Sequence, residues 1–296
     1  MNNTPALRAN DKDLGNGFIV HRLLPNAARQ AVGPFIFFDH FGPVTVTPAD
    51  NHDVRPHPHI GLATISYLFD GVIMHRDNLG YTQRIEPGAI NLMIAGRGIV
   101  HSERKPEAER DSTYVNHGLQ LWIALPTDQE KIQPSFNHTP ASTIPELNQE
   151  GTRIRVLMGT AFEVTSPVQT LSPTLYLDVQ IPPHSTWQLP MLAQEQAIYL
   201  ISGAIQMNGE ALIENQMQLI DSTVSLTTHS QASRLVVIGG EPLGHRFIWW
   251  NFVATKKEDI VLAAQAWEEQ DDTAGMGQVP GEHERIPLPK RPGNST

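Results

Sequence analysis

The sequence predicts an all-β protein of two β-barrel domains that pack together, followed by one short C-terminal helix. Helical periodicity is scarce, and most of the chain consists of short apolar runs separated by Gly, Pro, Asn and Asp, which is typical of a sandwich or barrel. The chain has 296 residues, 40% of them hydrophobic, so it exceeds a typical single domain and has enough apolar material for real cores. A weak internal repeat favours two copies of one barrel.

The predicted strands are the apolar runs that lie between turn residues. Clear examples are residues 61–69, 89–94, 119–125, 175–181 and 235–238. Short runs that are bounded by turn residues favour strands over helices. The sequence therefore predicts a chain made mostly of short strands.

One stretch near the C-terminus is predicted to be helical. Residues 256–270 are rich in strong helix formers, with apolar residues on one face, as in an amphipathic helix. These apolar residues are Ile260, Ala263, Ala264 and Trp267. The chain from Asp271 onward is rich in Pro and Gly, so we expect a tail that extends over the surface.

The internal repeat relates residues 57–71 (HPHIGLATISYLFDG) to residues 189–203 (LPMLAQEQAIYLISG). The two segments have equal length, and several residues fall opposite identical ones. These are Pro58, Tyr67, Leu68 and Gly71, opposite Pro190, Tyr199, Leu200 and Gly203. In the second segment Leu189 and Met191 replace two histidines. We therefore expect a duplicated barrel whose second copy lacks polar ligands.

A polar, Pro-interrupted stretch near residues 135–151 is the predicted linker. It divides the chain into an N-terminal metal-binding domain of residues 1–134 and a C-terminal domain of residues 135–296. The second domain includes the predicted helix and the surface tail, and we expect it to bind no metal.

Two pairs of polar residues carry the candidate chemistry. His57 and His59 are separated by one residue, and so are His101 and Glu103. Residues i and i+2 of a strand point to the same face, so two neighbouring strands can direct all four side chains into one barrel. A lone pair of histidines at this spacing is often structural, but the second pair, in a Gly-rich setting, favours a metal site.

The predicted ligands narrow the choice of metal. Three imidazoles and one carboxylate suit Fe, Mn, Co, Ni, Cu or Zn better than Mg or Ca. Four ligands on one side of an octahedral ion leave open positions for water, oxygen or substrate, as metal-assisted chemistry requires.

Composition excludes several classes of function. The formal net charge is −10 and no cluster of Lys and Arg is longer than a pair, so direct binding of nucleic acid is not expected. The chain has no cysteine, which excludes disulfides, Cys-ligated zinc, iron–sulfur clusters and thiol catalysis. The polar N-terminus and the lack of a long apolar run predict a soluble cytoplasmic protein without membrane contact.

Several segments resemble pirins, a branch of the cupin superfamily. These are His57-Pro58-His59, the Pro87-Gly88 turn, residues 95–103 (AGRGIVHSE), and residues 33–43, 240–260 and 279–289. The resemblance covers nearly the whole chain and implies a bicupin fold, that is, two jelly-roll barrels, with iron in the N-terminal one. Carried over residue by residue, it implies the same ligands: His57, His59, His101 and Glu103.

The resemblance also implies a cofactor and an activity. The cofactor is one divalent transition metal, with Fe(II) as the first candidate and Ni, Co, Mn, Cu or Zn as alternatives. The activity is that of a quercetin 2,3-dioxygenase, which cleaves a flavonol with O2 and releases carbon monoxide. Many cupins place a Glu ligand four residues after the second His, where this chain has Ala63. Glu103 then has to act as ligand and as the base that takes the flavonol 3-hydroxyl proton.

Two other functions fit the same resemblance. In the first, the protein is a non-enzymatic redox sensor or co-regulator whose iron changes charge and alters the binding of a protein partner. The second is a metal-dependent isomerase or small-molecule sensor, since cupins host many chemistries.

Two further residues are candidates for supporting roles. His75 lies just beyond the first ligand strand, where it either orients a ligand imidazole, contacts substrate, or is a turn histidine beside Asp77 and Asn78. Arg97, between Gly96 and Gly98, either binds a substrate anion or makes a structural pair in a tight turn.

Overall fold

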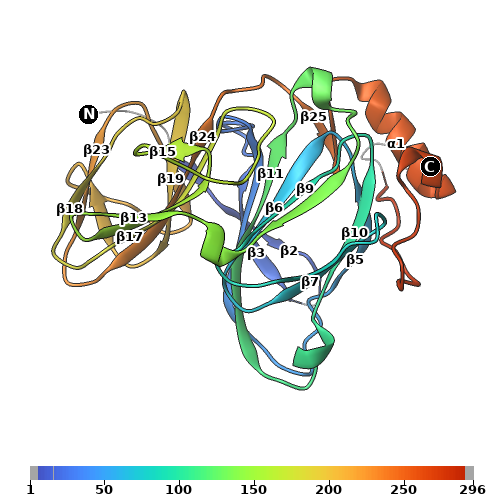
Figure 1. Cartoon of the computed structure of the whole chain (residues 1–296), viewed down its shortest axis with the longest axis horizontal. Coiled ribbons are helices and arrows are strands. Elements are labelled where there is room, and N and C mark those ends of the chain that lie inside the picture. The colour runs from blue at the N-terminus through green and yellow to red at the C-terminus, as the bar shows by residue number, and fades with distance from the viewer. Residues whose placement is uncertain (1–5, 16, 291–296) are drawn as a thin grey trace.

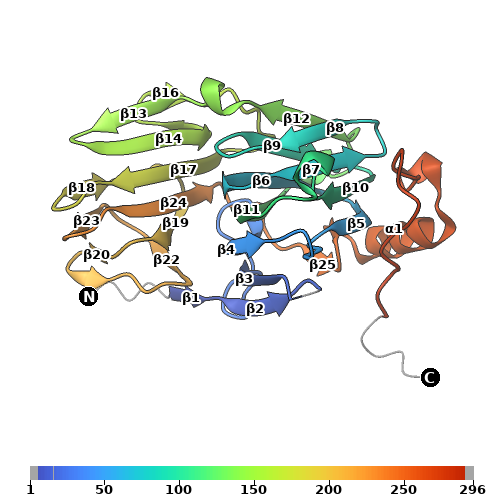
Figure 2. The ribbon, with the colours of Figure 1, turned by 90° about the horizontal axis from the view of Figure 1, so that it is seen from below.

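The computed structural model describes residues 6–15 and 17–290, and it forms two antiparallel β-barrels that lie side by side (Figures 1 and 2). In the first barrel a seven-stranded sheet faces a four-stranded sheet. The seven strands are, in order, β12 (Ser135–Thr139), β9 (Ile90–Ile94), β6 (Leu62–Asp70), β11 (Tyr114–Ala124), β4 (Phe35–Val46), β3 (Ile19–Leu24) and β2 (Asn10–Asp13). The four are β5 (Val54–His59), β10 (Ile99–Arg104), β7 (Ile73–Asp77) and β8 (Thr82–Ile85).

The second barrel repeats this arrangement. Its seven-stranded sheet has the order β1 (Ala6–Arg8), β22 (Gln216–Ile220), β19 (Glu195–Ser202), β24 (Ser233–Gly240), β17 (Thr174–Ile181), β14 (Thr152–Met158) and β13 (Glu146–Gln149). Its four-stranded sheet is β18 (Thr186–Leu189), β23 (Val224–Thr228), β20 (Ile205–Met207) and β21 (Glu210–Ala211). The predicted all-β, two-barrel architecture is thus confirmed.

The remaining elements are short. They are the hairpins β15 (Thr160–Ala161) with β16 (Val164–Thr165) and β25 (Phe247–Trp249) with β26 (Phe252–Ala254), the 3₁₀ turns Glu107–Glu109, Thr127–Gln129, Ala141–Thr143 and Asp272–Ala274, and the helix α1 (Lys257–Glu269). The helix predicted over residues 256–270 is therefore confirmed. No helix among the described residues is long and apolar enough to cross a membrane.

The two barrels have the same strand order, and the two segments of the internal repeat hold equivalent positions in it. The strands β5 and β6 of the first barrel hold the same places as β18 and β19 of the second. The division predicted between residues 134 and 135 stays a prediction. Near it, β12 pairs with β9 of the first barrel, while β1, at the other end of the chain, pairs with β22 of the second.

The two seven-stranded sheets pack face to face and build the largest apolar core. On β6, Ala63, Ile65 and Tyr67 belong to this core together with Tyr176 and Tyr199 of the second barrel. Because side chains alternate along a strand, the other residues of β6 face the interior of the first barrel. One face of this sheet thus joins the barrels while the opposite face is available to line a site.

A buried polar network crosses the same interface. The Tyr67 hydroxyl donates to Oδ2 of Asp178 at 2.7 Å and accepts from Arg155 at 2.8 Å. Arg234 forms two hydrogen bonds to the Asp178 carboxylate, at 2.9 and 2.6 Å. Since a buried carboxylate is costly unless it is paired and hydrogen-bonded, this network favours one relative placement of the barrels.

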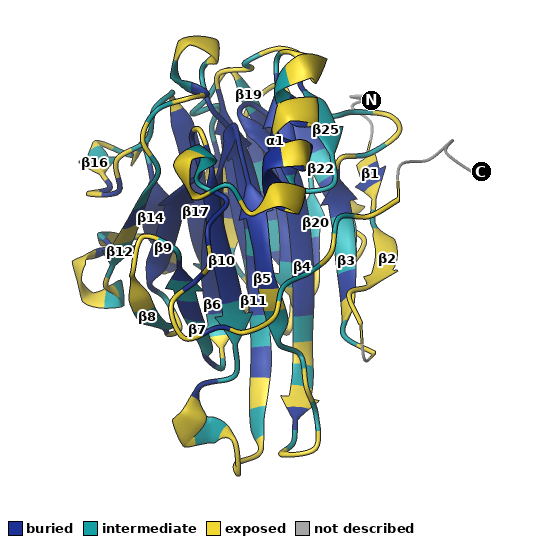
Figure 3. Cartoon of the chain, turned by 90° about the vertical axis from the view of Figure 1, so that its right-hand side faces the viewer, coloured by how far each residue is buried: buried dark blue, intermediate teal, exposed yellow. Residues whose placement is uncertain are grey.

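The C-terminal segment returns to the first barrel (Figure 3). Phe252 and Trp267 of this segment share an apolar cluster with Ile60. Gly61, with φ +68°, allows the close approach, because a Cβ there would lie 2.0 Å from the carbonyl oxygen of Val253. The segment after α1, expected to extend over the surface, lies against the strand β5, where the Ile286 N–H donates to the carbonyl oxygen of Pro56. Met276, Val279 and Glu282 of this segment are buried.

His40 occupies a buried position between the barrels. Its Nδ1 lies 2.8 Å from the Tyr199 hydroxyl, and its Nε2 lies 2.8 Å from Nε2 of His117. Burial lowers the pKa of His40 to about 3 from its usual 6.5. As the pH falls below 6.5, His40 therefore binds a proton in the unfolded chain but stays neutral in the folded chain. The free energy of unfolding decreases as a result.

We expect His40→Gln to flatten the acid dependence of stability. Between about pH 6 and about pH 4, His40 should contribute a slope of up to about 1.4 kcal/mol per pH unit, which the variant lacks. Urea unfolding at a series of pH values measures this slope. His229→Gln, at an exposed position, is the control and should keep the wild-type slope. Equal slopes in all three proteins would contradict the assignment.

Candidate metal centre

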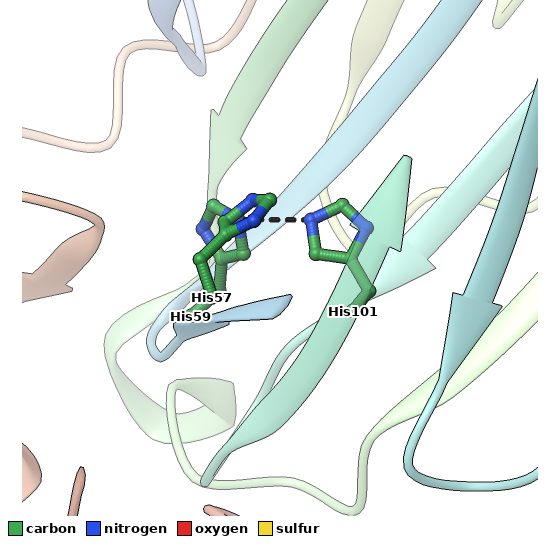
Figure 4. A group of neighbouring side chains, drawn as sticks. All are labelled: His57, His59 and His101. Atoms are coloured by element: carbon green, nitrogen blue, oxygen red, sulfur yellow. Dashed lines mark hydrogen bonds between the residues drawn. The ribbon is translucent and has the colours of Figure 1, made fainter. Parts of the chain in front are cut away.

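Three histidines of the first barrel converge on one point (Figure 4). One ring nitrogen from each of His57, His59 and His101 lies within 4.8 Å of the corresponding nitrogens of the other two. The strands β5 and β10 pair antiparallel with His101 opposite His57, so the predicted same-face spacing places the rings together. Nε2 of His59 lies 3.1 Å from Nε2 of His101. All three side chains are buried.

The protonation of these rings suits metal binding. Nδ1 of His57 lies 2.8 Å from the carbonyl oxygen of Arg55, which can only accept, so Nδ1 carries the proton and Nε2 keeps its lone pair. Burial lowers the pKa of His57 to about 4 and the pKa values of His59 and His101 well below 6.5. The imidazoles are therefore neutral at neutral pH, the form that coordinates metals.

The donor set fits a transition-metal ion. Neutral imidazole nitrogens that face one another at close range, away from solvent, place lone pair against lone pair unless a cation or proton lies between them. The deep burial of His57, His59 and His101 disfavours a proton, as their lowered pKa values indicate. A divalent ion with an affinity for nitrogen would satisfy the cluster.

Glu103 lies beside this cluster but outside it. It follows His101 by two residues on β10, and both line the same cavity. The register of β10 with β5 shifts between His101 and Glu103, and the carboxylate is not part of the three-histidine group. The Ser66 hydroxyl lies 3.4 Å from Glu103 Oε1, and burial raises the pKa of Glu103. Its role as fourth ligand stays a prediction.

The histidines form one wall of a cavity of about 580 Å³ inside the first barrel. The opposite wall comes from β3, β4 and β11 and includes two stacked rings, Phe37 and Trp122, with centroids 4.0 Å apart. Beside them Arg22 makes two hydrogen bonds of 2.8 Å to the carboxylate of Asp39. The cavity therefore combines an aromatic surface with a few fixed polar groups, as small-molecule sites commonly do.

The two candidates for supporting roles differ in position. His75 is buried, with its Nδ1 3.3 Å from Nδ1 of His101. Arg97 donates to the carbonyl oxygen of Thr273 at 2.8 Å and to the Gln133 side chain at 3.2 Å, and it does not line the cavity. These contacts agree with the second of the two roles considered for Arg97, a structural pairing in a tight turn. A role of Arg97 in binding a substrate anion stays a prediction.

Sequence reasoning missed several residues of the site. Trp122, Phe37, Arg22 and Asp39 line the cavity but carry no motif. A signal did exist on β11, where Leu119 and Leu121 face the core between the barrels and Trp122 faces the cavity. The alternation of apolar and polar residues along β11 could have divided its side chains between two faces. It could not have shown which of the two faces lines a site.

Comparison with known proteins gives matches over both barrels. The Pirin family model matches residues 17–123, and the model for the pirin C-terminal cupin domain matches residues 176–272. A pirin-like protein of Caulobacter vibrioides is 41% identical over 288 residues, covering 95% of this chain and 98% of the relative. Pirin of Homo sapiens is 32% identical over 270 residues, covering 88% and 90%.

Solved structures agree with these matches. The crystal structure of a quercetin 2,3-dioxygenase from Acinetobacter baumannii superposes with a TM-score of 0.90 at 32% identity, covering 99% of this chain and 97% of that one.

We expect the purified protein to bind close to one transition-metal ion per chain. A double variant, His57→Ala with His59→Ala, removes two of the three clustered nitrogens and should lose nearly all of the metal, because a lone His101 binds too weakly. Elemental analysis after dialysis measures the ratio. His229→Ala is the control and should keep the metal. A ratio near two, or a double variant that keeps its metal, would contradict this site.

Proposed function

The chain belongs to the pirin family of two-domain cupins, and from this premise we propose that it is a metal-dependent oxidoreductase that acts on quercetin-type flavonols with O2. The observation that carries the proposal is the meeting of three neutral, buried imidazoles at the wall of a large aromatic-lined cavity. The quercetin dioxygenase from Acinetobacter baumannii, which shares the fold over nearly the whole chain, supports this choice of substrate.

The proposed ligands are His57, His59 and His101, with Glu103 as the fourth. Fe(II) is the first candidate for the metal, and Ni, Co, Mn, Cu and Zn are the alternatives. When bound, the ion would supply Lewis acidity toward a hydroxyl oxygen of the substrate and a route for electrons to O2. The chain itself supplies neutral imidazoles and keeps bulk water away from them, since all three are buried.

Glu103 is the proposed base. Burial raises the pKa of its carboxyl group, which makes the carboxylate a better proton acceptor than an exposed glutamate. It lines the cavity next to the histidines, where the 3-hydroxyl of a flavonol would transfer its proton to a carboxylate oxygen. The Ser66 hydroxyl, which donates to Oε1 of Gln120 at 2.8 Å, lies 3.4 Å from Oε1 of Glu103, so the carboxylate has a polar neighbour in this wall.

The rest of the cavity suits a flat polyphenol. Its volume of about 580 Å³ lies within the range of drug-sized ligand pockets. The Trp122 ring, which stacks on Phe37, supplies an apolar surface against which an aromatic ligand can pack, while the other face of Phe37 is covered by the Arg22 guanidinium. Arg22 and Gln120 also line the cavity and can bind the hydroxyl groups of such a ligand.

We expect the iron-loaded protein to consume quercetin and O2 together. The loss of the visible absorbance of quercetin measures consumption of the flavonol, and an oxygen electrode measures the uptake of O2 in the same reaction. Glu103→Gln should keep part of the metal but lose roughly 10²- to 10⁴-fold in rate, because an amide cannot take the proton. Glu241→Gln, an exposed glutamate, is the control and should remain fully active.

Two results would count against this function. If wild-type protein loaded in turn with Fe, Ni, Co, Mn and Cu consumes neither flavonol nor O2, the dioxygenase proposal is wrong. If Glu103→Gln turns over at the wild-type rate, Glu103 is not the base.

A further inference from the structure

A buried row of three polar side chains leads from the metal site into the wall of the first barrel. Nδ1 of His101 lies 3.3 Å from Nδ1 of His75, and Nε2 of His75 lies 2.9 Å from Oδ2 of Asp77. The row follows from strand pairing, because β10 and β7 are antiparallel with His101 opposite Asp77. Each of these side chains belongs to a residue that is at most 2% exposed.

The far end of the row is held in place. Oδ1 of Asp77 accepts from the backbone N–H groups of Leu79 and Tyr81, at 3.0 and 3.1 Å. These bonds direct the other oxygen toward His75. The His75 ring stacks on Phe136 with centroids 4.2 Å apart and an angle of 16° between the planes. Neither the carboxylate nor the ring can turn without losing these contacts.

The chemistry of each atom fixes where the protons lie. A carboxylate can only accept, so Nε2 of His75 carries a proton and donates it to Asp77. In its neutral form the His75 imidazole has only this one proton, which leaves Nδ1 of His75 as an acceptor. The facing Nδ1 of His101 must then be the donor. Nε2 of His101 therefore keeps its lone pair, and this is the atom that faces Nε2 of His59 at 3.1 Å.

We propose that Asp77 is a positioning residue which, through His75, selects the tautomer of His101 and so presents Nε2 of His101 to the metal. The inference rests on the proposed metal site and adds a residue that no ligand motif contains. His57 obtains the same tautomer from a backbone carbonyl, and among the described residues no side chain is hydrogen-bonded to Nδ1 of His59. His101 is thus the ligand whose tautomer depends on side chains.

The variant Asp77→Asn tests the proposal with little change in shape. Asparagine keeps an oxygen for Leu79 and Tyr81 but presents an NH2 group to Nε2 of His75. That nitrogen must then accept, so the His75 proton moves to Nδ1 and the proton of His101 moves to Nε2. We expect the metal-free variant at about pH 8 to show the changed tautomer of His101 in long-range ¹H–¹⁵N NMR spectra of the imidazoles.

The same variant should bind Zn²⁺ about 10- to 100-fold more weakly, as measured by competition with a chelator. Asp11→Asn is the matched control, because Asp11 pairs with Nδ1 of His21 at 2.7 Å in an exposed position. It should change neither the zinc affinity nor the His101 signals.

A second variant keeps the test valid if Asp77→Asn does not fold. His75→Phe preserves a flat ring against Phe136 but removes the acceptor for His101, and we expect a similar loss of zinc affinity. If both variants bind Zn²⁺ as tightly as wild type, or if Asp77→Asn keeps the wild-type tautomer of His101, the proposal is wrong. Neither readout needs turnover, so a failure of flavonol cleavage alone would leave this inference standing.

Discussion

The packing of the two seven-stranded sheets against each other is the constraint on which the rest of the structure depends. It buries one face of β6 and β11 in the core between the barrels. Because side chains alternate along each strand, the opposite faces turn into the first barrel, where Gln120 and Trp122 of β11 form part of the cavity wall. A slip of one residue in either strand would exchange apolar and polar faces, so the interface and the site specify one register together.

The two barrels have the same strand order, but different kinds of side chain fill their interiors. The sequence repeat aligns His57 of β5 with Leu189 of β18, which is fully buried in an apolar cluster with Trp187 and Leu226. The first barrel keeps buried imidazoles whose protonation is suppressed by burial. Such groups stabilise a fold less than aliphatic side chains do. The second barrel can therefore act as the stable support against which the site-bearing barrel is built.

The strand β10, which carries His101 and Glu103, is held from both sides. His101 and Glu103 face the cavity, while Val100 and Ser102, which alternate with them, face the returning C-terminal segment. There Glu282 accepts from Ser102 at 2.7 Å and from Arg104 at 2.6 Å. Nearby, the backbone N–H of Ile286 donates to the carbonyl oxygen of Pro56 on β5, at 2.8 Å. The segment thus fixes the positions of both strands that carry the three clustered histidines, although it lies far from them in the sequence.

Local patterns in the sequence determined the features that depend on neighbouring residues. The helix α1 followed from its periodicity, the two-barrel fold from short apolar runs and a repeat, and the meeting of His57, His59 and His101 from their same-face spacing on two strands. Each is set by the geometry of one element or of one adjacent pair.

Only the tertiary structure decided the features that join distant elements. It shifted the register between His101 and Glu103, which leaves the carboxylate beside the histidine cluster. It also brought Asp77 and His75 behind His101, and Arg22 and Asp39 into the cavity wall. These contacts depend on which strands pair, in which register, and on how the sheets face each other. The spacing of residues along the chain does not determine which distant strands pair or in which register. Strand pairing and register follow from the burial of apolar surface between strands that are far apart in the sequence.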